Sequence, residues 1–164
     1  MSVTQIHLAL NHIPVLLSIT AAIILFFGLI KKNASIINTA LALFIAAAIF
    51  TLPVYFTGEG TEESVEKIPG VSESIIEEHE EAAVFALSLI FLTGALATVS
   101  FILKNKVALS RKMATATLVA AFISFGAFAQ TAHLGGQIRH TELRSNTSQN
   151  GNDNAAITKE LEDD

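Results

Sequence analysis

Residues 13–30, IPVLLSITAAIILFFGLI, decide the fold class, because they form an apolar segment without a single charged side chain. A helix needs about 20 such residues to cross the hydrocarbon core of a bilayer. Three further segments, at about 34–56, 82–103 and 113–132, have similar length and also lack Lys, Arg, Asp and Glu. The sequence therefore predicts four transmembrane helices.

The composition of the whole chain supports a membrane protein and excludes several classes of site. Hydrophobic residues make up 51% of the 164 residues, and charged residues only 15%. A soluble domain of this length carries more charge on its surface. The absence of cysteine excludes disulfides, thiolate metal sites and covalent c-type haem attachment. A net charge of −5 argues against nucleic acid as a partner.

The connections between the apolar segments predict an all-α, integral membrane, up-down four-helix bundle. Short connections at 31–33 and 104–112 make neighbouring helices antiparallel. The bundle is expected to occupy residues 1–144, including a loop at 57–79 on the side of the N-terminus. Residues 145–164 are polar and acidic, which predicts a disordered tail. No internal repeat is evident in the sequence.

Glycine, proline and serine predict where the helices begin and end. Pro14 fits a first helical turn, so the first helix is expected to start there and to leave His7 in a loop. Gly58 is expected to end the second helix. Ser74 begins a capping-box pattern that starts the third. Near the end of the fourth helix, Gly135 predicts a close backbone approach or a break.

The distribution of charge predicts the orientation in the membrane. The loop at 57–81 contains nine glutamates and one lysine, whereas the other two connections contain bases and no acid. Short basic loops stay in the cytoplasm. We therefore expect a multi-pass protein of a bacterial inner membrane, with both termini in the periplasm. The cytoplasmic bases are Lys31, Lys32, Lys104, Lys106, Arg111 and Lys112.

All five histidines fall on the predicted periplasmic side of the membrane. They are His7, His12, His79, His133 and His140. The three nearest the predicted membrane boundary, His12, His79 and His133, come from three different helices. A neutral imidazole is a good metal ligand, and a helix bundle is a common place for such a site. The sequence therefore predicts one convergent cofactor site, with His7 and His140 as further candidates.

Two kinds of occupant fit this set of residues. One is haem b held between two histidines on facing helices, with Leu, Ile and Phe side chains as apolar walls. The other is a divalent ion, Zn or Cu, bound by His12, His79 and His133 together with carboxylates such as Glu78 and Glu81. These glutamates also suit the first turns of a helix, where its dipole favours negative charge.

The first histidines form a motif that is found in a known family. The pattern His-x4-His-x-Pro at His7, His12 and Pro14 resembles the opening of the bacterial membrane family called domain of unknown function 2231. Members of that family typically begin with a His-Pro pair followed by a His-aromatic-Pro triplet. Here Leu8 follows His7 in place of proline, and Ile13 replaces the aromatic residue.

The end of the membrane part carries the second half of this resemblance. The family runs through four spans to a Gly-Gly segment, and TAHLGGQIRH at 131–140 resembles that ending. The resemblance covers residues 5 to about 141. The stretches at 57–74 and 133–142 are also similar to small membrane proteins of the Bacteroidetes group. The resemblance implies a four-span inner-membrane protein, similar to modules that occur near cytochromes, which favours haem.

Three classes of function follow from these observations. The first is an electron-transfer or redox-accessory protein with haem b near the periplasmic surface, working with a larger respiratory or redox complex. The second is a binding protein, sensor or transporter for divalent metal, although transport needs polar groups deep in the membrane. The third is an assembly subunit without a cofactor. The sequence favours a carrier or accessory subunit over an enzyme, since it has no nucleophile elbow or phosphate-binding loop.

Overall fold

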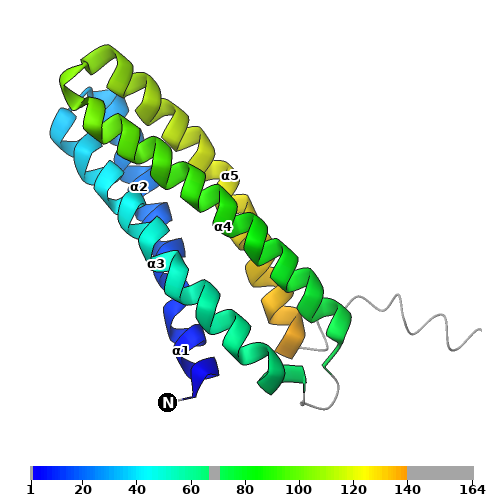
Figure 1. The fold of residues 1–164 in the computed structure, drawn as a ribbon. Coiled ribbons are helices and arrows are strands. Elements are labelled where there is room, and N and C mark those ends of the chain that lie inside the picture. The colour runs from blue at the N-terminus through cyan, green and yellow to red at the C-terminus, as the bar shows by residue number, and fades with distance from the viewer. Residues whose placement is uncertain (1, 67–70, 140–164) are drawn as a thin grey trace, which may run out of the picture.

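The computed structural model describes residues 2–66 and 71–139, and the regular structure in these ranges is helical (Figure 1). Four helical segments are long and apolar enough to cross a membrane, which confirms the predicted fold class. His140 and the predicted tail at 145–164 lie outside the described residues. The elements are α1 (Val3–Leu10), α2 (His12–Lys31), α3 (Ala34–Glu66), α4 (Glu73–Ile102), the 3₁₀ turn η1 (Leu103–Asn105) and α5 (Val107–Arg139).

The first span begins earlier than the sequence suggested. Ser2 and Gln5 form a reciprocal capping box that starts α1. Asn11 joins α1 to α2 in helical conformation, and its N–H donates to the carbonyl of His7 at 2.9 Å. Pro14 lies in the first turn of α2, as predicted, but the helical path has already been under way for several residues. The prediction that His7 lies in a loop is therefore wrong.

The second span, α3, ends later than predicted, because it continues through Gly58 to Glu66. Glycine costs a helix only about 1 kcal/mol relative to alanine, and tertiary packing offsets such a cost. The Thr61 hydroxyl donates to the Gly58 carbonyl at 2.7 Å, within the same helix. The prediction that Gly58 ends the helix is wrong, and the extra turns extend the bundle beyond its apolar part.

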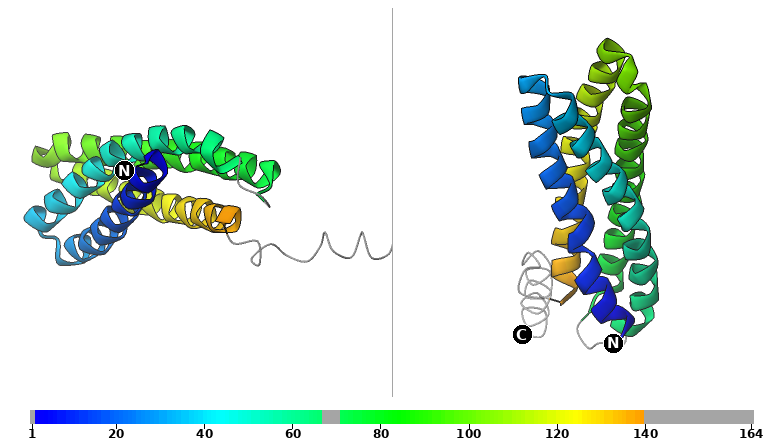
Figure 2. Two further views of the ribbon diagram at one scale, coloured as in Figure 1. Left: turned by 90° about the horizontal axis from the view of Figure 1, so that it is seen from below. Right: turned by 90° about the vertical axis from the view of Figure 1, so that its left-hand side faces the viewer.

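The helices form an up-down bundle built from two antiparallel hairpins (Figures 1 and 2). One hairpin pairs α2 with α3, and the other pairs α4 with α5; contacts of α3 with α4 and of α2 with α5 close the bundle. α1 continues the first helix and packs on the far part of α3. The two tight turns, which contain Lys32 and Lys104, lie at one end of the bundle. The start of α1 and of α4 and the ends of α3 and α5 lie at the opposite end (Figure 1).

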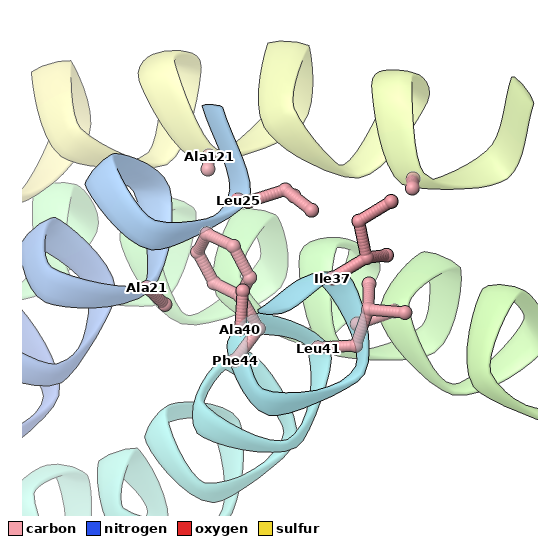
Figure 3. Close-up of a cluster of buried hydrophobic side chains, with 9 residues drawn as sticks. Ala21, Leu25, Ile37, Ala40, Leu41, Phe44 and Ala121 are labelled. Atoms are coloured by element: carbon pink, nitrogen blue, oxygen red, sulfur yellow. The ribbon is translucent and has the colours of Figure 1, made fainter. Parts of the chain in front are cut away.

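The core is packed with small side chains around a few large ones. Leu25 of α2 and Phe44 of α3 are fully buried and point into the space between the helices (Figure 3). Alanines fill most of the remaining core positions, and Gly94 leaves only enough room for Ala48, whose Cβ lies 2.7 Å from where a Cβ at Gly94 would stand. Such close approach is how helices associate in lipid, where no hydrophobic driving force acts between them.

Large apolar side chains cover the outside of the bundle. Among them Phe27, Phe85 and Phe122 are each more than half exposed. A water-facing surface of this kind is rare on monomeric soluble proteins, whereas lipid-facing surfaces have this composition. The outer surface therefore fits a multi-pass membrane protein.

A tight turn with one left-handed residue joins α2 to α3. Lys32 ends α2 with φ 52° and ψ 32°. The Asn33 N–H then donates to the Gly28 carbonyl at 3.0 Å, and the Asn33 side chain accepts from the Ile36 N–H at 3.2 Å. The left-handed conformation costs an L-residue with a Cβ roughly 1–2 kcal/mol, a cost that glycine avoids.

Lys32→Gly is therefore expected to stabilise the bundle by about 1 kcal/mol. Thermal unfolding of the purified protein in detergent measures this change. Lys31→Gly is the matched control, because Lys31 is the last residue of α2 and glycine there is expected to destabilise by up to about 1 kcal/mol. Equal effects of the two substitutions would contradict the assignment of the strain to Lys32.

Candidate functional site

The end of the bundle that carries the N-terminus contains two histidines bound to neighbouring helices. The first is His7 of α1, which is half-buried against α3. Its Nδ1 lies 3.0 Å from the carbonyl oxygen of Val54 and 3.3 Å from the hydroxyl of Thr57. This contact joins residues 47 positions apart and fixes α1 on the last turns of α3.

The second is His79 of α4, which makes the same kind of contact with α5. Its Nδ1 lies 3.0 Å from the carbonyl oxygen of Thr131. His79 is also half-buried. In both cases an imidazole on one helix is bonded to a main-chain carbonyl on the antiparallel helix of the same hairpin.

A glycine lies under each imidazole ring. A Cβ added to Gly58 would stand 3.2 Å from Cε1 of His7, and one added to Gly135 would stand 3.1 Å from Cε1 of His79. Each glycine follows the residue with the accepting carbonyl by four positions. The N–H of a residue four positions on is the usual helical partner of a carbonyl, whose second lone pair remains available. The glycines thus leave space for the rings to reach those carbonyls from the side.

These contacts fix the tautomer of both rings. A carbonyl oxygen only accepts, so Nδ1 of His7 and of His79 carries the proton and donates. In a neutral ring, Nε2 then carries a free lone pair. A neutral imidazole with such a nitrogen is the form that binds a metal. Histidine ligands of metals in proteins are commonly oriented in this way, with the other ring nitrogen donating to a carbonyl or carboxylate.

The surroundings of His79 favour its neutral form. Four glutamates flank it in the sequence, so it lies before the apolar segment that begins at Ala82. Burial lowers the pKa of the His79 imidazole; the bond to Thr131 raises it, and the nearby charge of His7 lowers it again, with a net decrease. A positive charge on His7 thus disfavours a positive charge on His79, although the two residues belong to different hairpins.

Asn11 adds a buried polar atom to this part of the bundle. Its side-chain oxygen Oδ1 is buried and has no hydrogen-bond partner within the described residues. Asn11 follows His7 by four positions, so the two side chains share a helix face. An unsatisfied buried acceptor costs about 1–3 kcal/mol. Such an atom is expected where a water molecule or a ligand completes the hydrogen bonding.

The other histidines of the predicted site are placed differently. His12 is exposed and bonds Leu8 of its own helix, with Nδ1 3.2 Å from the carbonyl. His133 is exposed too, and Gln137 Nε2 donates to its Nε2 at 2.7 Å, which occupies that lone pair. Both side chains therefore hydrogen-bond locally, and the predicted convergence of His12, His79 and His133 stays a prediction.

The carboxylates of the predicted metal site do not complete a cluster. Glu78 and Glu81 are exposed. Across 2–66 and 71–139, no three side chains of His, Asp or Glu form a group that could hold a metal ion. The pair that the structure does suggest, His7 with His79, includes the histidine that the sequence ranked below His12 and His133. The sequence feature that could have identified this pair is the glycine that lies beneath each ring.

A pair of imidazoles would suffice only for a cofactor that needs two protein ligands. A closed structural zinc site takes four ligands, whereas haem supplies four nitrogens of its own and leaves two axial positions. His7 and His79 each have Nδ1 bonded to a carbonyl, and Asn11 has a buried acceptor. Of the two occupants predicted from the sequence, haem b is the one that needs fewer protein ligands.

Comparisons with protein-family models, with curated proteins and with solved structures give no match. The resemblance of residues 5–141 to domain of unknown function 2231 stays a prediction.

Proposed function

We propose that this chain is an inner-membrane electron-transfer or redox-accessory protein that binds haem b through His7 and His79. The observation that carries the proposal is the matched pair of imidazoles whose Nδ1 atoms donate to main-chain carbonyls at 3.0 Å. When bound, haem b supplies a one-electron couple whose potential is set by its axial ligands and their hydrogen bonds.

The residues around the site would each have a defined part in binding. Val54 and Thr131 hold the two rings through their carbonyls, so that Nε2 of each ring stays a lone pair. The Asn11 side chain provides a buried polar contact. The apolar helices on the membrane side exclude water, which strengthens electrostatic interactions at the site.

The distribution of charge supports a periplasmic position for this site. The bases of the two tight turns lie at the far end of the bundle, and short basic connections are retained in the cytoplasm. Electrons would then be exchanged with a partner at the periplasmic surface or with a larger respiratory or redox complex in the same membrane.

An absorption spectrum of the detergent-purified full chain, made in haem-replete cells, tests the proposal. We expect a Soret band with sharp bands in the reduced form, a pyridine haemochrome typical of haem b, and iron in elemental analysis. A colourless preparation without iron would contradict haem binding. Stoichiometric zinc or copper instead would favour a divalent metal-binding protein.

A cofactor-free assembly subunit is the second candidate, and one surface feature favours it. A shallow apolar groove lies between α3 and α4, and its lining includes Ala48, Gly94 and Ala95. Small residues of this kind allow another membrane helix to approach closely. Co-purification of a stoichiometric partner, unaffected by alanine at His7 and His79, would support this alternative.

A further inference from the structure

The two hairpins of the bundle share a large part of their pattern of buried positions, although their residues differ. In the first helix of each hairpin, every buried residue of α2 has a buried counterpart in α4 that lies 72 positions later. His79 also follows His7 by 72 positions. The pairs are Pro14 with Ala86, Ser18 with Ile90, Ala21 with Thr93, Leu25 with Ala97, and Gly28 with Ser100.

The second helix of each hairpin repeats in part, with a separation of 77 positions; Ala48 is buried, for example, whereas its counterpart Phe125 is exposed. Gly135 follows Gly58 by this distance, and Thr131 follows Val54. Five buried pairs of α3 and α5 share the separation, namely Ile37 with Ala114, Ala40 with Thr117, Phe44 with Ala121, Ala47 with Ser124, and Thr51 with Phe128.

The repeat goes beyond the periodicity that any helix bundle has. Buried residues spaced alternately by four and three positions are typical of packed helices. The buried positions of two helices would therefore match at some separation in many bundles. Here the histidine, the accepting carbonyl and the glycine also fall at matching positions in both hairpins. Residue identities alone gave no evident repeat, and it is these matching contacts that indicate one.

The direction of the helices fixes how the two halves are related. Each half has two spans, so the first helix of each half starts at the same end of the bundle. Two such halves are related by an approximate two-fold axis along the bundle, parallel to the membrane normal. By this relation, His7 and His79 occupy equivalent positions in the two halves, and each is half-buried against the second helix of its own hairpin.

We propose that the two hairpins are equivalent half-sites and that each supplies one axial imidazole, so that both axial positions of the haem iron are filled. This inference rests on the proposed function. Two equivalent imidazoles leave no open position for a small molecule on the iron. The site would then carry electrons and would not bind or activate gases.

Carbon monoxide added to the reduced, purified wild-type protein tests whether a position is open. We expect the Soret band to stay unchanged, because both axial positions are occupied. A CO-shifted Soret band in the native protein would overturn the inference and leave haem binding intact. A wild type that contains no haem would overturn the proposed function, and this inference with it.

Conservative ligand changes test the equivalence of the halves. His7→Met and His79→Met are each expected to raise the midpoint potential, by similar amounts, since a thioether ligand favours reduced iron. The matched controls His12→Met and His133→Met should leave the potential unchanged. A shift in only one of the two variants would show that the halves are not equivalent. If methionine abolishes haem retention, a low-spin bis-imidazole electron paramagnetic resonance spectrum of the wild type decides the question.

Discussion

His79→Ala is expected to leave the purified protein almost free of haem while the bundle still folds. Loss of a group that only orients a metal ligand typically costs 10–100-fold in affinity, so loss of the ligand itself is expected to cost more. The ring of His79 is half-buried near the end of the bundle and makes its bond to the Thr131 carbonyl there. Its removal therefore leaves the central core of alanines, Leu25 and Phe44 intact.

The ratio of haem to protein after purification measures this effect, and circular dichroism with gel filtration checks the fold. His133→Ala is the matched control, because His133 is exposed and bonds only Gln137 of its own helix among the contacts described. His7→Ala should behave like His79→Ala, and His12→Ala like the control. Loss of haem from the His133 variant, with retention in the His79 variant, would reverse our assignment of the ligand.

Gly135→Val is expected to weaken haem retention roughly 10–100-fold without removing any ligand. A Cβ at this position would already lie 3.1 Å from Cε1 and 3.3 Å from Nδ1 of His79. The two further methyl groups of valine add bulk beside the ring, so we expect the ring to leave the Thr131 carbonyl. Freed from that bond, the imidazole loses both its fixed tautomer and its direction.

Gly126→Val is the control for this substitution, because Gly126 lies in α5 too and a Cβ there would meet nothing within 4 Å. Both changes replace glycine by a β-branched residue in the same helix, so they share any change in helix propensity. Haem content and the position of the Soret band should change only in the Gly135 variant. Unchanged haem content in both variants would contradict the role that we give to the glycine.

The fold could be predicted from the sequence, because the length of an uncharged apolar segment is enough to predict a membrane span. Four uncharged segments predicted four spans, and the structure has them. The boundaries were less predictable, since a capping box at Ser2 and packing around Gly58 each extended a helix beyond the point where local signals suggested an end. From sequence alone, a glycine within a helical segment predicts the end of the helix. Only the structure shows the side chain that packs on the glycine and lets the helix continue.

The candidate site was predictable only in part, because sequence position does not give the direction of a side chain. His12 lies five residues after His7, which is about 140° round a helix of 3.6 residues per turn. Only one of the two side chains can therefore face α3. Because the sequence predicted a helix that starts at Pro14, after both histidines, it did not indicate which one. The repeat was hidden for a similar reason, since counterparts such as Leu25 and Ala97 share burial but not identity.

The bonds that hold His7 and His79 end on main-chain oxygens, and this has a consequence for how the protein can vary. Changing the side chain of Val54 or Thr131 leaves the acceptor in place, so saturation mutagenesis should find these two positions permissive. Intolerance should instead be concentrated one helical turn further on, at Gly58 and Gly135, where the side chain is absent. Natural variants of this protein can thus diverge widely around the site while keeping the two rings aligned.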